Sequence, residues 1–185
     1  VLVGGDYQGQ NAAVPNAQVT YFGGDAVLQA NATENGNGGK VVVWADDTTR
    51  AYGRIEARGG AQGGNGGFIE NSGKRYLDFR GVTDTAAPRG FAGTLLLDPN
   101  DIHIDNSTDD LQGGMFSGGI FAGGTGNPII SWATINAQTG SLEIRTNSAA
   151  SSGAGDIYLD ASGTLTGPST FTLLANRAIN FASGV

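Results

Sequence analysis

Apolar residues occur in short runs that follow glycine and end at turn-forming residues. The strongest run lies in GGKVVVWADDTTRAYG, residues 38–53, and related runs lie in GGFIENSG and AGTLLLDPN. Alignment of these segments places Lys40, Phe68 and Thr94 in one column, at nearly equal spacings. Runs of about four to six residues bounded by Gly, Asn, Asp or Pro are typical of β-strands. The recurrence predicts short parallel strands separated by turns, with Trp44 either covering the core or lying at a corner.

A second set of strand-like segments follows the first. GRIEARG and RYLDFRG align Ile55 with Leu77 at a shorter spacing, and GSLEIRT, GDIYLDA and STFTLLAN recur at spacings that are shorter still. If GRIEARG and RYLDFRG stack directly on each other, their outward charges form exposed diagonal pairs: Glu56 with Arg80, and Asp78 with Arg58.

Side chains of a strand point alternately to its two faces. In the first column this alternation directs Val42, Glu70 and Leu96 outward, onto a face that we expect to be solvated. The residues directed inward are predicted to form the apolar core: Val41, Val43, Ile55, Ile69, Leu77, Leu95, Leu97, Ile102, Ile104, Leu142, Ile144, Ile157, Leu159, Phe171 and Leu173.

Helical periodicity is confined to SWATINAQ, residues 131–138, where Ser131 is predicted to cap a short helix that buries Ile135. Short strands without crossover helices exclude a doubly wound α/β fold and leave a β-sandwich or a parallel β-helix. Similar segments that stack in register favour the β-helix. We therefore expect an all-β chain that forms one β-helix segment over residues 1–185.

Composition narrows the possible partners. The chain has 185 residues, a net charge of −7 and 39% hydrophobic residues, so it is neither disordered by composition nor suited to nucleic acid. It has no cysteine and no apolar run of about 20 residues, which removes thiolate metal sites and a membrane-spanning helix from the predictions. Val1 and Val185 lie in strand-like patterns, so we expect a piece of a longer chain whose ends self-associate.

One acidic segment is a candidate for catalysis. DPNDIHIDNSTDD contains His103 and the aspartates 98, 101, 105, 109 and 110, and a β-helix enzyme acting on carbohydrate would need such carboxylates on one face. We interpret Asp98 to Asp101 as a turn, the remainder as a solvated loop that includes Asp105, Asp109 and Asp110, and His103 as an ordinary surface residue. On this interpretation the chain is not an enzyme.

Calcium is the metal with the best candidate residues. Asp98, Asn100 and Asp101 are weak candidates, because their spacing begins like an EF-hand loop but places Ile102 at the next ligand position. The calcium-binding β-roll repeat fails too, since Phe68 stands where its aspartate is required. We therefore predict no metal and no cofactor.

Several segments in a fixed order resemble filamentous-haemagglutinin-type adhesins, which are two-partner secretion exoproteins of Gram-negative bacteria. They are GGKVVVWADDTTRAYG, RIEARGGAQGGNGGF, the SGK of residues 72–74, DFRG, VTDTAAPRG and AGTLLLDPNDIHI. The likeness extends to ISWATINAQTGSLEIRT and GDIYLDASGTLTGPSTFTLLANRAINF, and it covers the chain from about residue 16. The resemblance implies a right-handed parallel β-helix and secretion through a dedicated outer-membrane transporter. Asn71 and Ala51 depart from the family pattern, and we interpret the glycine-rich residues 111–126 as a local insertion.

The resemblance implies a secreted or cell-surface adhesin segment that displays binding loops to a receptor on a host cell, a surface or a neighbouring cell. Two alternatives stay open. One is a subunit of a self-assembling extracellular filament or sheath, and the other is a carbohydrate-active β-helix enzyme.

Overall fold

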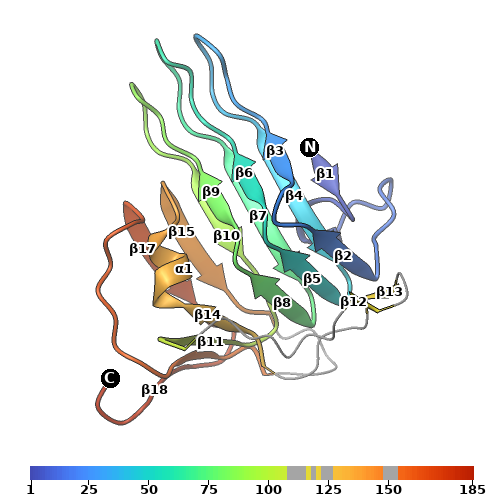
Figure 1. Cartoon of the computed structure of the whole chain (residues 1–185), viewed down its shortest axis with the longest axis vertical. Helices are drawn as coiled ribbons and strands as arrows, with labels where there is room; N and C mark the ends of the chain where they lie inside the picture. The colour runs from blue at the N-terminus through green and yellow to red at the C-terminus, as the bar shows by residue number, and fades with distance from the viewer. Residues whose placement is uncertain (108–115, 118–119, 122–126, 148–153) are drawn as a thin grey trace.

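A computed structural model describes residues 1–107, 127–147 and 154–185, together with two short strands between them. The chain forms a nearly all-β parallel solenoid of about five turns (Figure 1). One face, which we call the front sheet, is a parallel sheet of six strands. In spatial order they are β1 (Leu2–Val3), β4 (Lys40–Ala45), β7 (Phe68–Gly73), β10 (Thr94–Leu97), β15 (Ser141–Arg145) and β17 (Thr170–Leu174).

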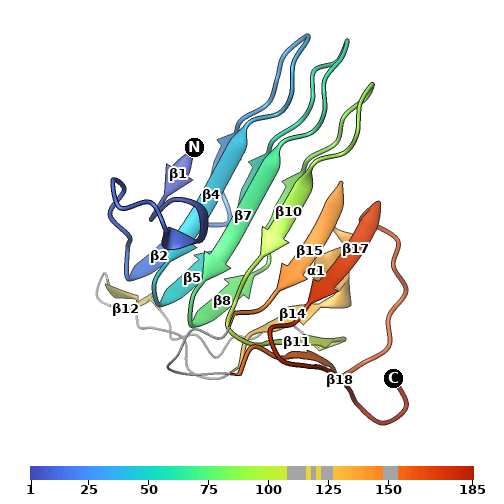
Figure 2. The same cartoon turned by 180° about the vertical axis from the view of Figure 1, so that it is seen from behind.

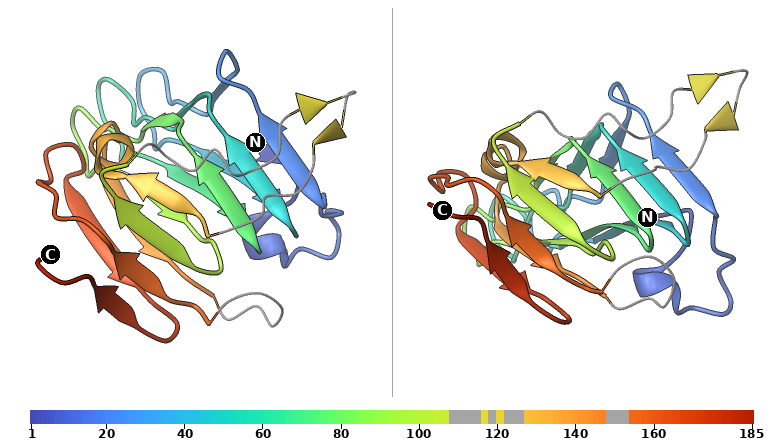
Figure 3. Two further views of the ribbon diagram at one scale, coloured as in Figure 1. Left: turned by 60° about the horizontal axis from the view of Figure 1, so that its bottom comes forward. Right: turned by 90° about the horizontal axis from the view of Figure 1, so that it is seen from below.

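The other faces of the coils form smaller parallel sheets (Figure 3). In the N-terminal half these are β2 (Val19–Phe22), β5 (Thr48–Ala51) and β8 (Tyr76–Phe79), followed by β3 (Val27–Gln29), β6 (Arg54–Glu56) and β9 (Val82–Asp84). In the C-terminal half they are β14 (Ile129–Ser131), β11 (Ile102–Asp105), β16 (Ile157–Leu159) and β18 (Ile179–Phe181). The strands β12 (Phe116–Ser117) and β13 (Ile120–Phe121) pair antiparallel within the predicted insertion, of which the remainder lies outside the described residues.

The strands stack in register, so equivalent side chains of successive coils form columns. Val41, Ile69, Leu95, Leu142 and Phe171 are register partners along the front sheet, as the first alignment predicts. All of the predicted core residues are buried except two, and those two, Phe171 and Leu173, are partly buried against the same apolar cluster.

Glycine precedes the front strands because neighbouring coils come too close there for a side chain. A Cβ atom at Gly67 would lie 2.1 Å from the carbonyl oxygen of Gly39, and one at Gly93 would lie 2.0 Å from that of Gly67. Real Cβ contacts are not that short, so these positions accept only glycine without a backbone shift. Glycine at these positions therefore permits the close approach of successive coils.

The predicted alignment of Ile55 with Leu77 is wrong. Ile55 stacks on Thr83, whereas Leu77 stacks on Thr49 in a different sheet, because Leu77 lies less than one full coil after Ile55. The short spacings of the C-terminal segments are also steps between faces, since β15 and β17 share the front sheet while β16 lies in another.

The predicted diagonal charge pairs consequently do not form. Glu56 instead pairs with Arg54 at 2.5 Å, and Asp84 lies 3.5 Å from Arg58. The carboxylate of Asp78, which is buried, accepts hydrogen bonds from Arg80 and from the Tyr52 hydroxyl, with the latter at 2.6 Å.

The expectation of a solvated outer face is wrong for the front sheet. Val42, Glu70 and Leu96 do alternate with the inward columns, but their exposed fractions are only 0%, 0% and 2%. Residues 4–15, which we call the N-terminal strap, cross this face (Figure 2). Trp44 also lies on this outer side, under the strap, and is 3% exposed.

Asn71 interrupts an inward column of the front sheet between Val43 and Leu97. It is fully buried, and neither its amide nitrogen nor its amide oxygen has a hydrogen-bond partner among the described residues. An unpaired buried amide costs free energy, so Asn71 is a local weak point in the core.

Three glycine-rich extensions project together from one edge of the solenoid (Figures 1 and 2). They are stacked by backbone hydrogen bonds and by asparagine side chains: Asn37 Oδ1 accepts from the Asn65 N–H at 2.8 Å, and Asn65 Oδ1 accepts from the Phe91 N–H at 2.9 Å. The extensions comprise residues 30–39, 57–67 and 85–93.

The single predicted helix is confirmed as α1 (Trp132–Asn136). Ser131 is its N-cap, and its hydroxyl accepts from the Thr134 N–H at 3.0 Å, while Ile135 is fully buried. No helix within the described ranges has the length and hydropathy needed to cross a membrane.

The two faces of the front sheet give a stability test. We predict that Leu95→Ala and Leu96→Ala each lower the free energy of unfolding by about 2–5 kcal/mol, because both side chains are buried. Leu174→Ala is the matched control, since Leu174 is 44% exposed and should cost well under half as much. The measurement is denaturant unfolding followed by circular dichroism. A Leu96→Ala effect as small as that of Leu174→Ala would show that the outer face of the front sheet is not buried at Leu96.

Candidate functional site

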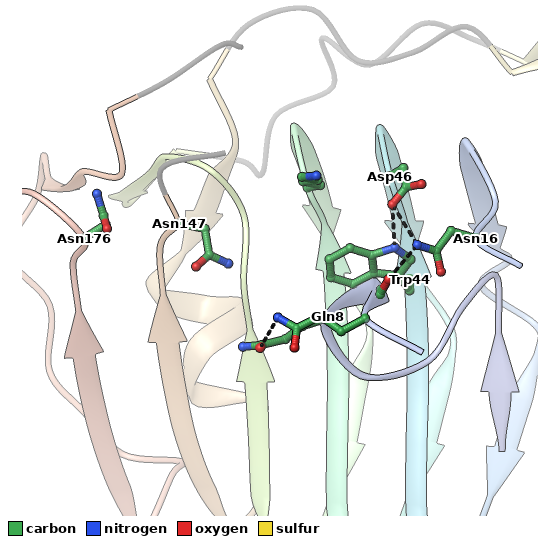
Figure 4. A pocket seen from close by; sticks show the side chains of 9 residues that line it. Gln8, Asn16, Trp44, Asp46, Asn147 and Asn176 are labelled. Atoms are coloured by element: carbon green, nitrogen blue, oxygen red, sulfur yellow. Dashed lines mark hydrogen bonds between the residues drawn. The ribbon is translucent and has the colours of Figure 1, made fainter. Parts of the chain in front are cut away.

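A groove of about 530 Å³ lies where strands of the front sheet end, beside the N-terminal strap (Figure 4). Its lining is mostly amide side chains, with one carboxylate, one lysine and one tryptophan. The residues that line it are Gln8, Gly9, Gln10, Asn16, Trp44, Asp46, Lys74, Asn147 and Asn176.

Parallel strands explain why residues distant in sequence line one groove. Asp46 directly follows β4, Lys74 directly follows β7, and Asn147 and Asn176 each lie just beyond the ends of β15 and β17. Because all these strands run in the same direction, their carboxyl ends meet at one edge of the sheet. The polar residues after each strand are thereby arranged in a row along the solenoid axis.

The N-terminal strap forms the opposite wall of the groove. Asp6 pairs with Lys40 at 2.8 Å, and the Tyr7 ring meets the Phe68 ring edge to face at 5.8 Å between centroids. The strap packs on Trp44 through Gly9, whose φ of +62° and lack of a side chain both suit this close contact. These contacts fix the strap over β4 and β7.

Asn16 and Trp44 are held together by one carboxylate of the groove. Asp46 Oδ1 accepts hydrogen bonds from Asn16 Nδ2 at 3.1 Å and from Trp44 Nε1 at 3.2 Å. Asn16 Nδ2 also donates to the Gly9 carbonyl at 2.9 Å, which ties the strap to the corner after β4. The amide oxygen of Asn16 is buried and has no hydrogen-bond partner among the described residues.

Glu70 lies on β7 under the strap and is fully buried. Its carboxylate accepts from the Gln8 N–H at 3.2 Å and from the Ser72 hydroxyl at 2.9 Å. Burial raises the pKa of Glu70 to about 7, against the opposing effect of these two hydrogen bonds. Gln8 has a left-handed φ of 52°, so the strap takes a strained conformation at the residue that contacts Glu70.

Asp98 is a second buried carboxylate at this edge of the sheet. Asn147 Nδ2 donates to its Oδ1 at 2.5 Å, and its Oδ2 has no hydrogen-bond partner in the described part of the chain. Burial raises the pKa of Asp98 to about 6, and the Asn147 hydrogen bond opposes this rise. Asp98 thus supports Asn147 from beneath the groove.

Two carboxyl groups with raised pKa values are the pattern expected of an acid–base site. Glu70 and Asp98 are 0% and 1% exposed, however, so neither meets solvent or a substrate in this conformation. Their geometry supports the strap and Asn147, and the groups that do reach the groove are hydrogen-bonding amides.

The three calcium candidates, Asp98, Asn100 and Asp101, differ in their burial and in their hydrogen-bond partners. Asp98 and Asn100 are buried in the predicted turn. Asp101 Oδ1 accepts from the N–H groups of Gly155 and Asp156 at 2.9 and 2.7 Å. Within the described ranges, no group of three or more His, Asp or Glu side chains could hold a metal ion.

Residues 102–105 of the predicted solvated loop form a strand instead, since β11 spans Ile102–Asp105. His103 points outward and is partly exposed; it stacks on Tyr158 at 4.4 Å, and its Nδ1 lies 2.5 Å from Asp160. Asp105 accepts from the Ser107 hydroxyl at 2.8 Å, and the predicted members Asp109 and Asp110 lie outside the described residues.

The groove itself is absent from the sequence-based predictions. Its one accessible signal is the recurrence of a polar residue just after each front strand, at Asp46, Lys74, Asn147 and Asn176. Glu70 could be identified as unusual because it aligns with Val42 and Leu96 of the neighbouring front strands, but nothing local indicates that a distant strap covers it.

Glu70 makes stability depend on pH. The folded chain retains its proton at pH values at which the unfolded chain has released it, so this stabilisation is complete below about pH 4.5 and is lost as pH rises through about 7. We predict that Glu70→Gln unfolds less readily than the wild type at pH 8, by on the order of 3 kcal/mol, with a smaller difference at pH 5.

The measurement is denaturant unfolding at both pH values, and Glu34→Gln, which alters an exposed carboxylate, should reproduce the wild-type pH dependence. If Glu70→Gln changed stability equally at pH 5 and pH 8, Glu70 would not titrate in this range.

Comparison with known proteins adds no family assignment. No protein-family model matches the chain, and no curated protein matches it significantly.

Proposed function

We propose that the chain is a structural segment of a secreted or cell-surface adhesin, in which a β-solenoid displays binding loops to another cell or surface. The adhesin role extends the sequence resemblance. The structure supplies the framework for this role, a parallel β-solenoid of about five turns.

The observation that carries the proposal is the stack of three extensions. They project from the solenoid body as a group and present exposed side chains, among which Phe91 is 82% exposed and Arg58 and Arg89 are exposed charges. A large exposed aromatic beside arginine is typical of residues that anchor protein interfaces. Glycine-rich loops held in register by hydrogen bonds can offer such residues without forming a second domain.

The architecture supports display because a solenoid grows by adding coils at constant cross-section. Each further coil moves the loops farther along the axis and leaves the core columns unchanged. In this proposal the chain reaches the cell exterior through an outer-membrane two-partner secretion transporter, and its receptor is a protein or glycan of a host cell, a surface or a neighbouring cell.

A filament subunit is the second candidate, and exposed apolar strands at both ends of the stack favour it. At the C-terminal end, Leu174, Ile179 and Phe181 are 44%, 39% and 65% exposed, and at the N-terminal end Val1 and Val27 are 52% and 55% exposed. Edge strands with free backbone groups and apolar side chains pair readily with another chain. Head-to-tail stacking of identical chains would cover both ends.

Attachment of chain-coated beads to cultured cells tests the adhesin proposal. We expect beads that carry the wild-type chain to attach above the level of albumin-coated beads. Arg89→Ala together with Phe91→Ala should lower attachment at least threefold, because these side chains lie at the exposed tip of the third extension.

Leu165→Ala, which alters an exposed apolar residue elsewhere, is the control and should attach like the wild type. If the double substitution left attachment unchanged, the extensions would not be the binding surface. Open fibres at high protein concentration, with no attachment under any condition, would contradict the adhesin proposal and favour the filament.

A further inference from the structure

We propose that the groove beside the N-terminal strap binds an uncharged oligosaccharide. The inference deepens the proposed function, on which it rests, by giving a ligand class to a surface separate from the three extensions. It is argued from the chemistry of the lining, from its charge, from its shape and from its unpaired polar atoms.

The lining has the hydrogen-bonding capacity that neighbouring hydroxyl groups require. Five of its side chains are amides, and each amide has two N–H donors and an oxygen with two acceptor sites. Part of this capacity is used within the chain, since Asn16 Nδ2 donates to Asp46 and the Gly9 carbonyl, Gln10 Nε2 to Gln8, and Asn147 Nδ2 to Asp98. A sugar hydroxyl is likewise both donor and acceptor, so an amide can bind two adjacent hydroxyls at once. The five amides are Gln8, Gln10, Asn16, Asn147 and Asn176.

The charge of the lining favours an uncharged ligand. Asp46 and Lys74 contribute one charge of each sign, so the described residues of the lining carry no net formal charge. The chain as a whole carries −7, which repels polyanions such as acidic polysaccharides. An anionic ligand would need a cluster of Arg or Lys, and Lys74 is the only basic residue among the described lining residues.

The shape of the groove favours a chain of sugars over a single one. Its walls run from Asp46 after β4 to Asn176 after β17, which are separated by four steps between adjacent front strands. At about 4.8 Å for each step, the row is roughly 19 Å long. The volume of about 530 Å³ lies within the range of small-molecule sites, and the side chains along the row are spaced by coils, as a polymer repeat would require.

Two polar atoms at the site lack a partner among the described residues. Asn16 Oδ1 lies in the lining, and Asp98 Oδ2 lies behind Asn147; both are buried. Buried polar atoms are nearly always paired in folded proteins. A hydroxyl of a bound ligand could pair with the Asn16 oxygen after a small movement of the strap, while Asp98 holds Asn147 in place.

Calorimetric titration of the full chain with uncharged tetrasaccharides tests the inference. The probes are cellotetraose, maltotetraose, laminaritetraose and chitotetraose, with a heparin tetrasaccharide as the anionic comparison. We expect saturable binding of at least one uncharged probe and none of the anionic probe. Gln10→Ala combined with Asn176→Ala should weaken binding at least tenfold, because these exposed amides lie at two parts of the groove without core contacts.

Gln62→Ala, an exposed amide in the second extension, is the matched control and should bind like the wild type. No binding of any uncharged probe, equal binding by the double variant, or preference for the heparin probe would each overturn the inference. Cleavage of a bound probe, seen as new reducing ends, would overturn it as a pure binding site. If no glycan binds while the beads still attach to cells, the groove assignment is wrong and the adhesin proposal stands. If a glycan binds while the beads do not attach, the adhesin proposal is wrong and the groove assignment stands.

Discussion

In-register stacking of parallel strands is the constraint on which the rest of this structure depends. Each front strand bonds to the strand one coil away, so a side chain at one position meets its counterpart in the next coil. Aliphatic columns at Val41, Ile69 and Leu95 follow from this pairing, and so does glycine at Gly67 and Gly93, where backbones approach most closely. A solenoid built in this way has no central core apart from its columns, and the burial of each coil depends on its neighbours.

The same stacking turns local sequence into extended surfaces. Asparagines at equivalent places, such as Asn37 and Asn65, hold the extensions together, while polar residues after successive front strands line the groove. The N-terminal strap adds what repetition cannot supply. It covers one face of the front sheet, buries Glu70 and gives the groove its second wall, so the pH-dependent part of the structure lies where the repeat is broken.

Much of the fold was predictable because periodic burial leaves a periodic sequence. The front columns, the Ser131-capped helix and the all-β class all follow from alternation and turn residues. The second strand set was misaligned because RIE and YLD have the same local pattern but occupy different faces, and local pattern does not record which coil face a strand joins. The groove and the buried state of Glu70 could not be predicted, since both require the strap to lie over strands that come much later in the sequence. The calcium candidates were chosen from their spacing alone. In the structure Asp98 and Asn100 are buried, and Asp101 accepts hydrogen bonds from two backbone N–H groups.

Disulfide crosslinking tests the coil register most directly, because the chain contains no cysteine of its own. Glu56 and Asp84 are register partners on adjacent coils, and neighbouring strands lie about 4.8 Å apart, within reach of a disulfide. Glu56→Cys with Asp84→Cys should therefore crosslink under mild oxidation, whereas Glu56→Cys with Asp78→Cys, the partner of Glu56 in the shorter alignment, should not. Crosslinking of the second pair without the first would show that the coils follow the shorter alignment of Ile55 with Leu77 and would contradict the stacking on which this account rests.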